Sequence, residues 1–112
     1  MSYDVSLNDE HGPVTVPRHT EGGSYVLGGL PYAELNITYN YAEHYYALFG
    51  GLRTLNGATG GSTIPTLEAA IDKLGVVRDP SYWAGTPGNA GFALSILLSW
   101  AHLHPDATWE VT

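Results

Sequence analysis

Few residues in this sequence have the type and spacing that catalysis needs. The chain holds no cysteine, so neither a thiolate nucleophile nor a disulfide is available. It contains no Gly-x-Ser-x-Gly elbow and no His-Glu-x-x-His pair. Glu43 and His44 are adjacent and His102 and His104 are two apart, so neither pair shares a helix face. We therefore predict no catalytic residue, no metal site and no cofactor, and rank a small hydrolase or metal-dependent enzyme third among the functional hypotheses.

Tyrosines are concentrated in one stretch of the chain. Tyr39, Tyr41, Tyr45 and Tyr46 fall within a few positions of one another. Tyr41 and Tyr45 are four apart and would share one face of a helix. Tyrosine is favoured where one end of the side chain is buried and the other is wet, as at an interface or a pocket wall. The alternative is a sheet–helix core with the hydroxyls at its rim.

Arg53 is the only basic residue between Arg18 and Lys73. It lies just after a glycine pair and before a predicted helix start near Ser62. A lone arginine close to backbone donors and a helix N-terminus could hold a phosphate or a carboxylate. The alternative is a structural ion pair with an acidic neighbour.

Trp83 and Asn89 flank a helix-start signal at Thr86-Pro87. Trp83 could stack on a base or fill a pocket of a partner, or it could be a lid over the core. Rings, an amide and one cation could then form a single ligand pocket from Tyr41, Tyr45, Trp83, Asn89 and Arg53.

The elements that must position these residues change in type along the chain. Apolar and polar residues alternate around Val5 and Leu7 and again over 34–39, which predicts strands. Further short strands are predicted at 14–16, ended by Pro17, and at 24–27, with a loop over 18–23 between them.

Helices are predicted over 40–49, 62–74 and 87–104. Asn40 would cap the first, with Glu43 completing a capping box. Pro65 would lie in the first turn of the second. The third is apolar nearly all round and should be central. A last short strand or packed tail is predicted around Trp109.

Strands followed by helices, without β–α–β alternation, predict an α+β fold. We expect a single domain over 1–112, with a small antiparallel sheet covered on one face by about three helices. A chain of 112 residues with 44% hydrophobic residues is consistent with one folded domain.

Charge excludes some partners. The net charge is −7 with only 13% charged residues, which argues against binding to a nucleic-acid backbone or an anionic membrane. The most apolar segment, 91–103, is too short to cross a bilayer, and the N-terminus lacks the pattern of a secretory signal. We therefore expect a protein partner or a small-molecule ligand.

Several motifs resemble a family of small uncharacterised proteins carried by phages, prophages and other mobile elements. They are the segments 22–29, LNITYNY at 35–41, LRTL at 52–55, STIPTLE at 62–68 and YWAGTPGNA at 82–90. The resemblance spans about Gly22 to Trp109. Where that family often carries lysine or arginine after the Tyr-Trp pair, this chain has Ala84, Gly91 and Phe92, which argues against phosphate binding at that helix start.

The resemblance implies, by analogy, an accessory protein in the cytoplasm of a bacterial host. The first hypothesis is a non-catalytic, anti-CRISPR-like inhibitor that binds a host protein or nucleoprotein complex. The alternative is a protein that sequesters a nucleotide immune signal, with a homo-oligomer as one way to complete its pocket. The candidate binding residues are Tyr39, Tyr41, Tyr45, Tyr46, Arg53, Trp83 and Asn89.

Overall fold

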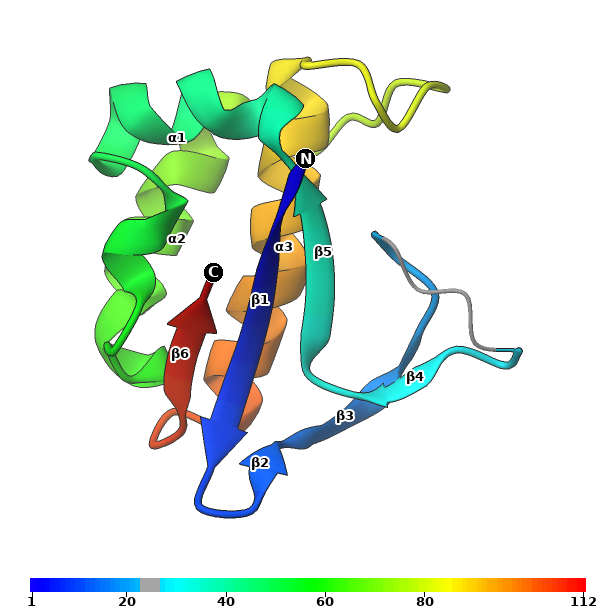
Figure 1. Cartoon of the computed structure of the whole chain (residues 1–112). Helices are drawn as coiled ribbons and strands as arrows, with labels where there is room; N and C mark the ends of the chain where they lie inside the picture. The colour runs from blue at the N-terminus through cyan, green and yellow to red at the C-terminus, as the bar shows by residue number, and fades with distance from the viewer. Residues whose placement is uncertain (23–26) are drawn as a thin grey trace.

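A computed structural model of the chain describes residues 1–22 and 27–112. Its main sheet has four antiparallel strands around a central β1 (Ser2–Asp9). β5 (Glu34–Thr38) and β6 (Thr108–Val111) pair with β1 on opposite sides, and β2 (Gly12–Pro13) completes a hairpin at its far end (Figure 1). Side chains of β1 point alternately to the two faces of the sheet: Tyr3, Val5 and Leu7 are buried on one face, whereas Asp4 is exposed on the other.

Three α-helices cover the buried face of this sheet (Figure 1). They are α1 (Ala42–Phe49), α2 (Gly60–Leu74) and α3 (Pro87–Leu103), with short 3-10 helices η1 (Tyr39–Tyr41) and η2 (Leu52–Leu55) between the first elements. α3 is the central helix, since Leu94, Leu97 and Trp100 are all buried. The predicted α+β fold is confirmed.

A second, two-stranded sheet corrects the prediction for 14–23. β3 (Thr15–His19) pairs with β4 (Leu30–Tyr32), a strand that the sequence did not indicate. Pro17 lies inside β3 and does not end it, because the register shifts between Thr15 and His19 and no regular ladder bond is needed there. Of the strand predicted at 24–27, positions 24–26 lie outside the described residues and Leu27 is in a turn.

The predicted cap of the first helix is wrong. The Thr38 hydroxyl accepts a hydrogen bond from the backbone N–H of Asn40, so the chain turns into η1 before α1 begins at Ala42. No side chain caps α1 itself. The amide of Asn40 donates instead to the carbonyl of Trp83 at 2.8 Å, which ties η1 to the segment before α3.

The second helix begins two residues earlier than predicted. Thr59 caps α2, and the N–H groups of Gly60 and Gly61 donate to the carbonyls of Ala107 at 2.7 Å and Pro105 at 2.8 Å. These distant carbonyls satisfy donors that would otherwise be unpaired at a helix start. Pro65 therefore lies in the second turn and not in the first.

Other segments contact both edges of the main sheet. The hydroxyl of Tyr82 donates to the carbonyl of Asn36 at 3.0 Å on the β5 edge. On the β6 edge, Trp109 exchanges backbone hydrogen bonds with Gly57 and Ala58. These contacts occupy part of each edge, and occupied backbone groups are not available for pairing with an added strand. In the described part of the chain, no helix is long and apolar enough for a membrane span.

Candidate functional site

The structure distributes the seven predicted binding residues among different places. Tyr39, Tyr46 and Arg53 lie together at the surface, and Tyr41 and Asn89 line a cavity elsewhere. Tyr45 is fully buried in the core, whereas Trp83 is 60% exposed.

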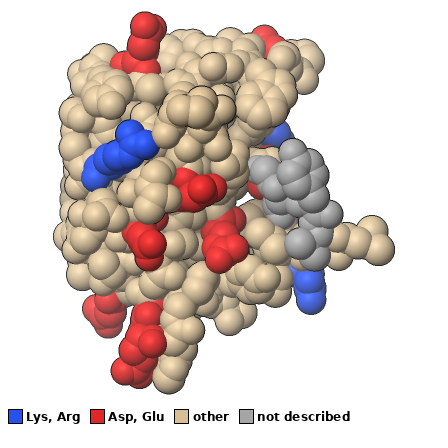
Figure 2. All heavy atoms as spheres, in the orientation of Figure 1, with Lys and Arg blue, Asp and Glu red and all other residues tan. Residues whose placement is uncertain are grey.

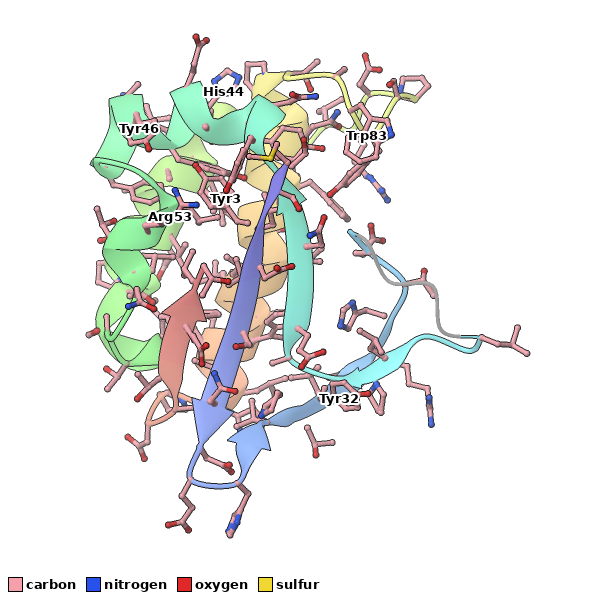
Figure 3. The ribbon with its side chains drawn as sticks, viewed as in Figure 1. Tyr3, Tyr32, His44, Tyr46, Arg53 and Trp83 are labelled. Atoms are coloured by element: carbon pink, nitrogen blue, oxygen red, sulfur yellow. The ribbon has the colours of Figure 1, made fainter. Side chains whose placement is uncertain are left out.

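Arg53 lies at the centre of the surface group. Its Nη2 donates to the Tyr39 hydroxyl at 2.8 Å. Its guanidinium carbon lies 4.9 Å from the centroid of the Tyr3 ring and 5.6 Å from that of Tyr39. The two rings meet edge to face at 4.7 Å. The hydroxyl of Tyr46, a residue that is 59% exposed, lies beside that of Tyr3. We name Tyr3, Tyr39, Tyr46 and Arg53 the tyrosine–arginine cluster; Figure 3 labels Tyr3, Tyr46 and Arg53.

The guanidinium in this cluster has no carboxylate partner. Among the described residues the ion pairs join His11 to Glu10 and Arg78 to Glu21, and neither involves Arg53. The alternative of a structural ion pair is therefore not observed. Cation–π contact and one hydroxyl hold the exposed guanidinium in place, which leaves N–H donors free to meet an incoming acceptor.

Tyr3 provides the buried support of the cluster. Burial raises the pKa of its hydroxyl, and the neighbouring Tyr46 hydroxyl raises it further. Tyr3 therefore stays uncharged at neutral pH and does not neutralise the arginine. β1 places Tyr3 here because its side chain belongs to the inward-facing set of the strand.

Carboxylates occupy the outer face of the main sheet. The strand register places Ser6 of β1 opposite Glu34 of β5 on one side and Glu110 of β6 on the other. Asp4 is two residues away on the same face, and all three acids are exposed. We name Asp4, Glu34 and Glu110 the acidic sheet face. Figure 2 shows acidic side chains gathered over these strands, beside a hollow of about 330 Å³ that they help to line.

A cavity of about 390 Å³ lies between β5, α3 and the segment 75–86. Its floor is apolar and buried and includes Leu35, Ile37 and Ala93. Its rim carries the ionisable groups, namely Glu21, Arg78 and Asp79. Arg53, Tyr45 and Trp83 are not among the lining residues, so the cation at this cavity is Arg78.

Asn89 is buried beside the cavity, and its side chain is fully engaged. Its Oδ1 accepts from the N–H of Asp79 at 2.9 Å, and its Nδ2 donates to the carbonyls of Ser81 and Ala84, each at 3.0 Å. These bonds position the segment 79–84 against α3. They leave the amide little capacity to contact a ligand, so the structure gives Asn89 a positioning role.

Tyr41 and Tyr45 match the core alternative. Tyr41 donates to the carbonyl of Tyr82, and Tyr45 donates to the carbonyl of Ala90 at 3.0 Å. Burial, with a smaller contribution from Tyr82, raises the pKa of Tyr41 to about 12. Burial raises the pKa of Tyr45 well above its ordinary value. Their hydroxyls are neutral and internally paired, and neither ring is exposed at the outer surface of the protein, although Tyr41 lines the cavity.

Trp83 lies away from the tyrosine–arginine cluster. Its ring packs edge to face on Tyr82 at 5.0 Å and remains largely exposed, so it is not a lid. Figure 3 shows Trp83 on the β5 side of the sheet and Arg53 on the β6 side. The single pocket predicted from Tyr41, Tyr45, Trp83, Asn89 and Arg53 is therefore not formed. Tyr41 and Asn89 line the cavity and Arg53 belongs to the tyrosine–arginine cluster, whereas Tyr45 lies in the core and Trp83 in neither site.

Two site residues were missed from the sequence. Tyr3 is part of the period-2 pattern of β1, and only the fold brings it beneath Arg53. Arg78 lies in a segment without regular structure, and its ring partner Phe92 is on α3, 4.3 Å from the guanidinium carbon. Neither pairing leaves a local signal in the sequence.

No family model matches the chain, and no curated protein or solved structure gives a significant match. Within the described residues, no three His, Asp or Glu side chains come together as a metal site would require.

Proposed function

We propose that this chain is a non-catalytic binding protein that docks on a host protein complex and inhibits it, in the cytoplasm of a bacterial host. The observation that carries the proposal is the tyrosine–arginine cluster, with its exposed guanidinium that no carboxylate of the described chain neutralises. The resemblance to phage-carried proteins supports the inhibitory role by analogy.

The composition of the cluster favours a protein partner. Tyrosine and arginine are enriched among the residues that dominate binding energy at protein interfaces. Arg53 is already held by Tyr3 and Tyr39, so it loses little conformational freedom on binding. A well-placed partner carboxylate would form a charge-assisted pair with its free N–H groups.

The acidic sheet face indicates which charges the surface of the partner carries. Asp4, Glu34 and Glu110 are exposed, and none of them forms an ion pair within the described residues. They complement lysine or arginine side chains and would speed association at low salt. The partner is therefore a basic protein surface with one acidic residue set to meet Arg53.

Affinity capture with matched variants tests this proposal. The immobilised wild-type chain is compared with Tyr46→Ala/Arg53→Ala and with Arg18→Ala/Tyr32→Ala in a bacterial lysate, and bound proteins are quantified by mass spectrometry. The second pair is the control, because it also removes one exposed tyrosine and one exposed arginine, but from β3 and β4.

The proposal expects one host complex to be retained by the wild type and the control pair and reduced by about tenfold or more in the cluster pair. Equal retention by all three proteins, or no enriched host protein, would overturn it. Melting curves of the three proteins verify that each is folded.

A further inference from the structure

We propose that the cavity between β5, α3 and the segment 75–86 binds an uncharged, mainly apolar ring compound that carries one hydrogen-bond acceptor. This site is separate from the tyrosine–arginine cluster and independent of the protein-binding proposal. The volume of about 390 Å³ lies within the usual range for small-molecule sites.

The walls of the cavity favour rings. Tyr41 and Tyr82 meet at 6.0 Å in an edge-to-face arrangement, and Phe92 lies on the α3 side. Leu35 and Ile37 form an apolar floor. A flat apolar ring gains both area burial and edge or face contacts with such walls.

The floor does not favour a charged ligand. The Tyr41 hydroxyl at this floor is neutral and already donates to the Tyr82 carbonyl. Among the groups that line the cavity, Arg78 is paired with Glu21 at 3.1 Å, and Asp79 adds another carboxylate at the rim. An anion would meet two carboxylates and a cation would meet Arg78, while either would lose hydration that the floor cannot replace.

One group at the rim can select a polar atom of the ligand. The hydrogen bond of Arg78 to Glu21 is the only one that its guanidinium makes within the described residues, and its carbon lies 4.3 Å from the Phe92 centroid. The remaining N–H groups can donate to a carbonyl of a ligand whose ring occupies the floor.

The walls of the cavity formed by α3 and the segment 75–84 are also preformed. Three hydrogen bonds from the Asn89 side chain hold 79–84, and the backbone of 75–77 packs directly on Gly88 and Gly91 of α3. A site held in this way loses little free energy to ordering when a ligand binds.

Three probes with one ring system and different head groups test the inference. They are 2-naphthamide, which is uncharged, 2-naphthoate, which is an anion, and 2-naphthylmethylammonium, which is a cation. Each is titrated into the ¹⁵N-labelled full chain, and amide shifts are followed together with nuclear Overhauser contacts from probe to protein rings. The variants are Ala93→Phe, which fills the cavity, Arg78→Ala, which removes the rim donor, and Ala69→Phe on α2 as a matched control.

The inference expects saturable shifts of Ile37, Phe92 and Ala93 with 2-naphthamide, with binding about tenfold tighter than for either charged probe. Binding should be abolished in Ala93→Phe, weakened about tenfold in Arg78→Ala and unchanged in Ala69→Phe. If Ala93→Phe does not fold, Arg78→Ala and the Overhauser contacts to Tyr82 and Phe92 decide the question. No saturable shift, shifts centred on the α1–α2 groove, or equal or tighter binding of a charged probe would overturn the inference.

Discussion

The buried side-chain amide of Asn89 holds the loop beside the cavity in place. Its three hydrogen bonds reach Asp79, Ser81 and Ala84 and so span the part of the loop beside the cavity from 79 to 84. Without the amide, buried backbone groups of this loop would lose their partners, and an unpaired buried polar group is costly.

Asn89→Ala should therefore lower the free energy of unfolding by about 2–4 kcal/mol. Asn40→Ala removes an exposed amide with a single bond to Trp83 and should cost less than about 1 kcal/mol. Urea unfolding followed by tryptophan fluorescence measures both. Equal effects of the two substitutions would contradict the positioning role of Asn89.

Two buried tyrosines make stability sensitive to alkaline pH. The pKa of Tyr41 is about 12 in the folded chain and 10 when unperturbed, and burial raises the pKa of Tyr45 well above the same ordinary value. The unfolded state therefore releases these protons first, so the stability is fully present below pH 10 and falls as the pH rises toward 12.

The double variant Tyr41→Phe/Tyr45→Phe should show a shallower loss of stability between pH 10 and 12 than the wild type. Urea midpoints measured across this range provide the comparison. Identical slopes for the two proteins would contradict burial as the origin of the shifts.

Among the elements, α3 depends on close backbone contact with the segment before it. A methyl group on Gly88 would overlap the carbonyl oxygen of Val77, and one on Gly91 would overlap that of Gly75. In an open helix, Gly→Ala is stabilising by about 1 kcal/mol. At Gly88 and Gly91 the same substitution should instead be destabilising, because the backbone of 75–77 would have to move.

Gly88→Ala should destabilise the chain by about 2 kcal/mol or more and loosen the rim of the cavity. Ser99→Ala, at an exposed position of the same helix, should change stability by less than about 0.5 kcal/mol. Thermal or urea unfolding checks both values. A Gly88→Ala protein as stable as the wild type would contradict the close packing.

The elements also show what the sequence could and could not predict. Hydrophobic alternation in β1 and β5, the end of the first helix at residue 49 and the helix start at Thr86-Pro87 depend on neighbours in the chain, and these predictions are confirmed. The start of α2 depends on carbonyls some 45 residues away, at Pro105 and Ala107, so local signals placed it too late.

For the site residues too, local sequence predicts the local structure, whereas distant residues decide where each side chain lies. Tyr41 and Tyr45 do share a helical stretch, yet their burial is decided by partners at Tyr82 and Ala90. The pairing of Arg53 with Tyr3 joins residues 50 positions apart and leaves no periodic trace in the sequence. Sequence reasoning named these residues as candidates but could not assign them to a surface, a core and a cavity.

At the scale of the whole molecule, the clustering of carboxylates on one sheet face should lower the free energy of unfolding. Glu34 and Glu110 flank Ser6 across three strands, with Asp4 nearby, and like charges on one sheet face repel. The basic partner proposed above would relieve this repulsion on binding.

Neutralising that face with Asp4→Asn/Glu34→Gln/Glu110→Gln should raise stability by a few tenths to about 1 kcal/mol at low salt, and the gain should vanish near 1 M salt. The triple variant Glu10→Gln/Glu43→Gln/Asp106→Asn changes the net charge equally at dispersed exposed sites and should gain less. Urea unfolding at two salt concentrations checks the difference. A gain that is the same for both triples would show that only net charge matters.

The most direct test of the binding account is a dose–response measurement on the captured host complex. Its activity is followed while purified wild-type chain, Tyr46→Ala/Arg53→Ala or Arg18→Ala/Tyr32→Ala is added. The account predicts that the wild type and the β3–β4 pair inhibit at the same concentration, while the cluster pair needs about tenfold more or does not inhibit. Inhibition of equal strength by all three proteins, or by none, would contradict it.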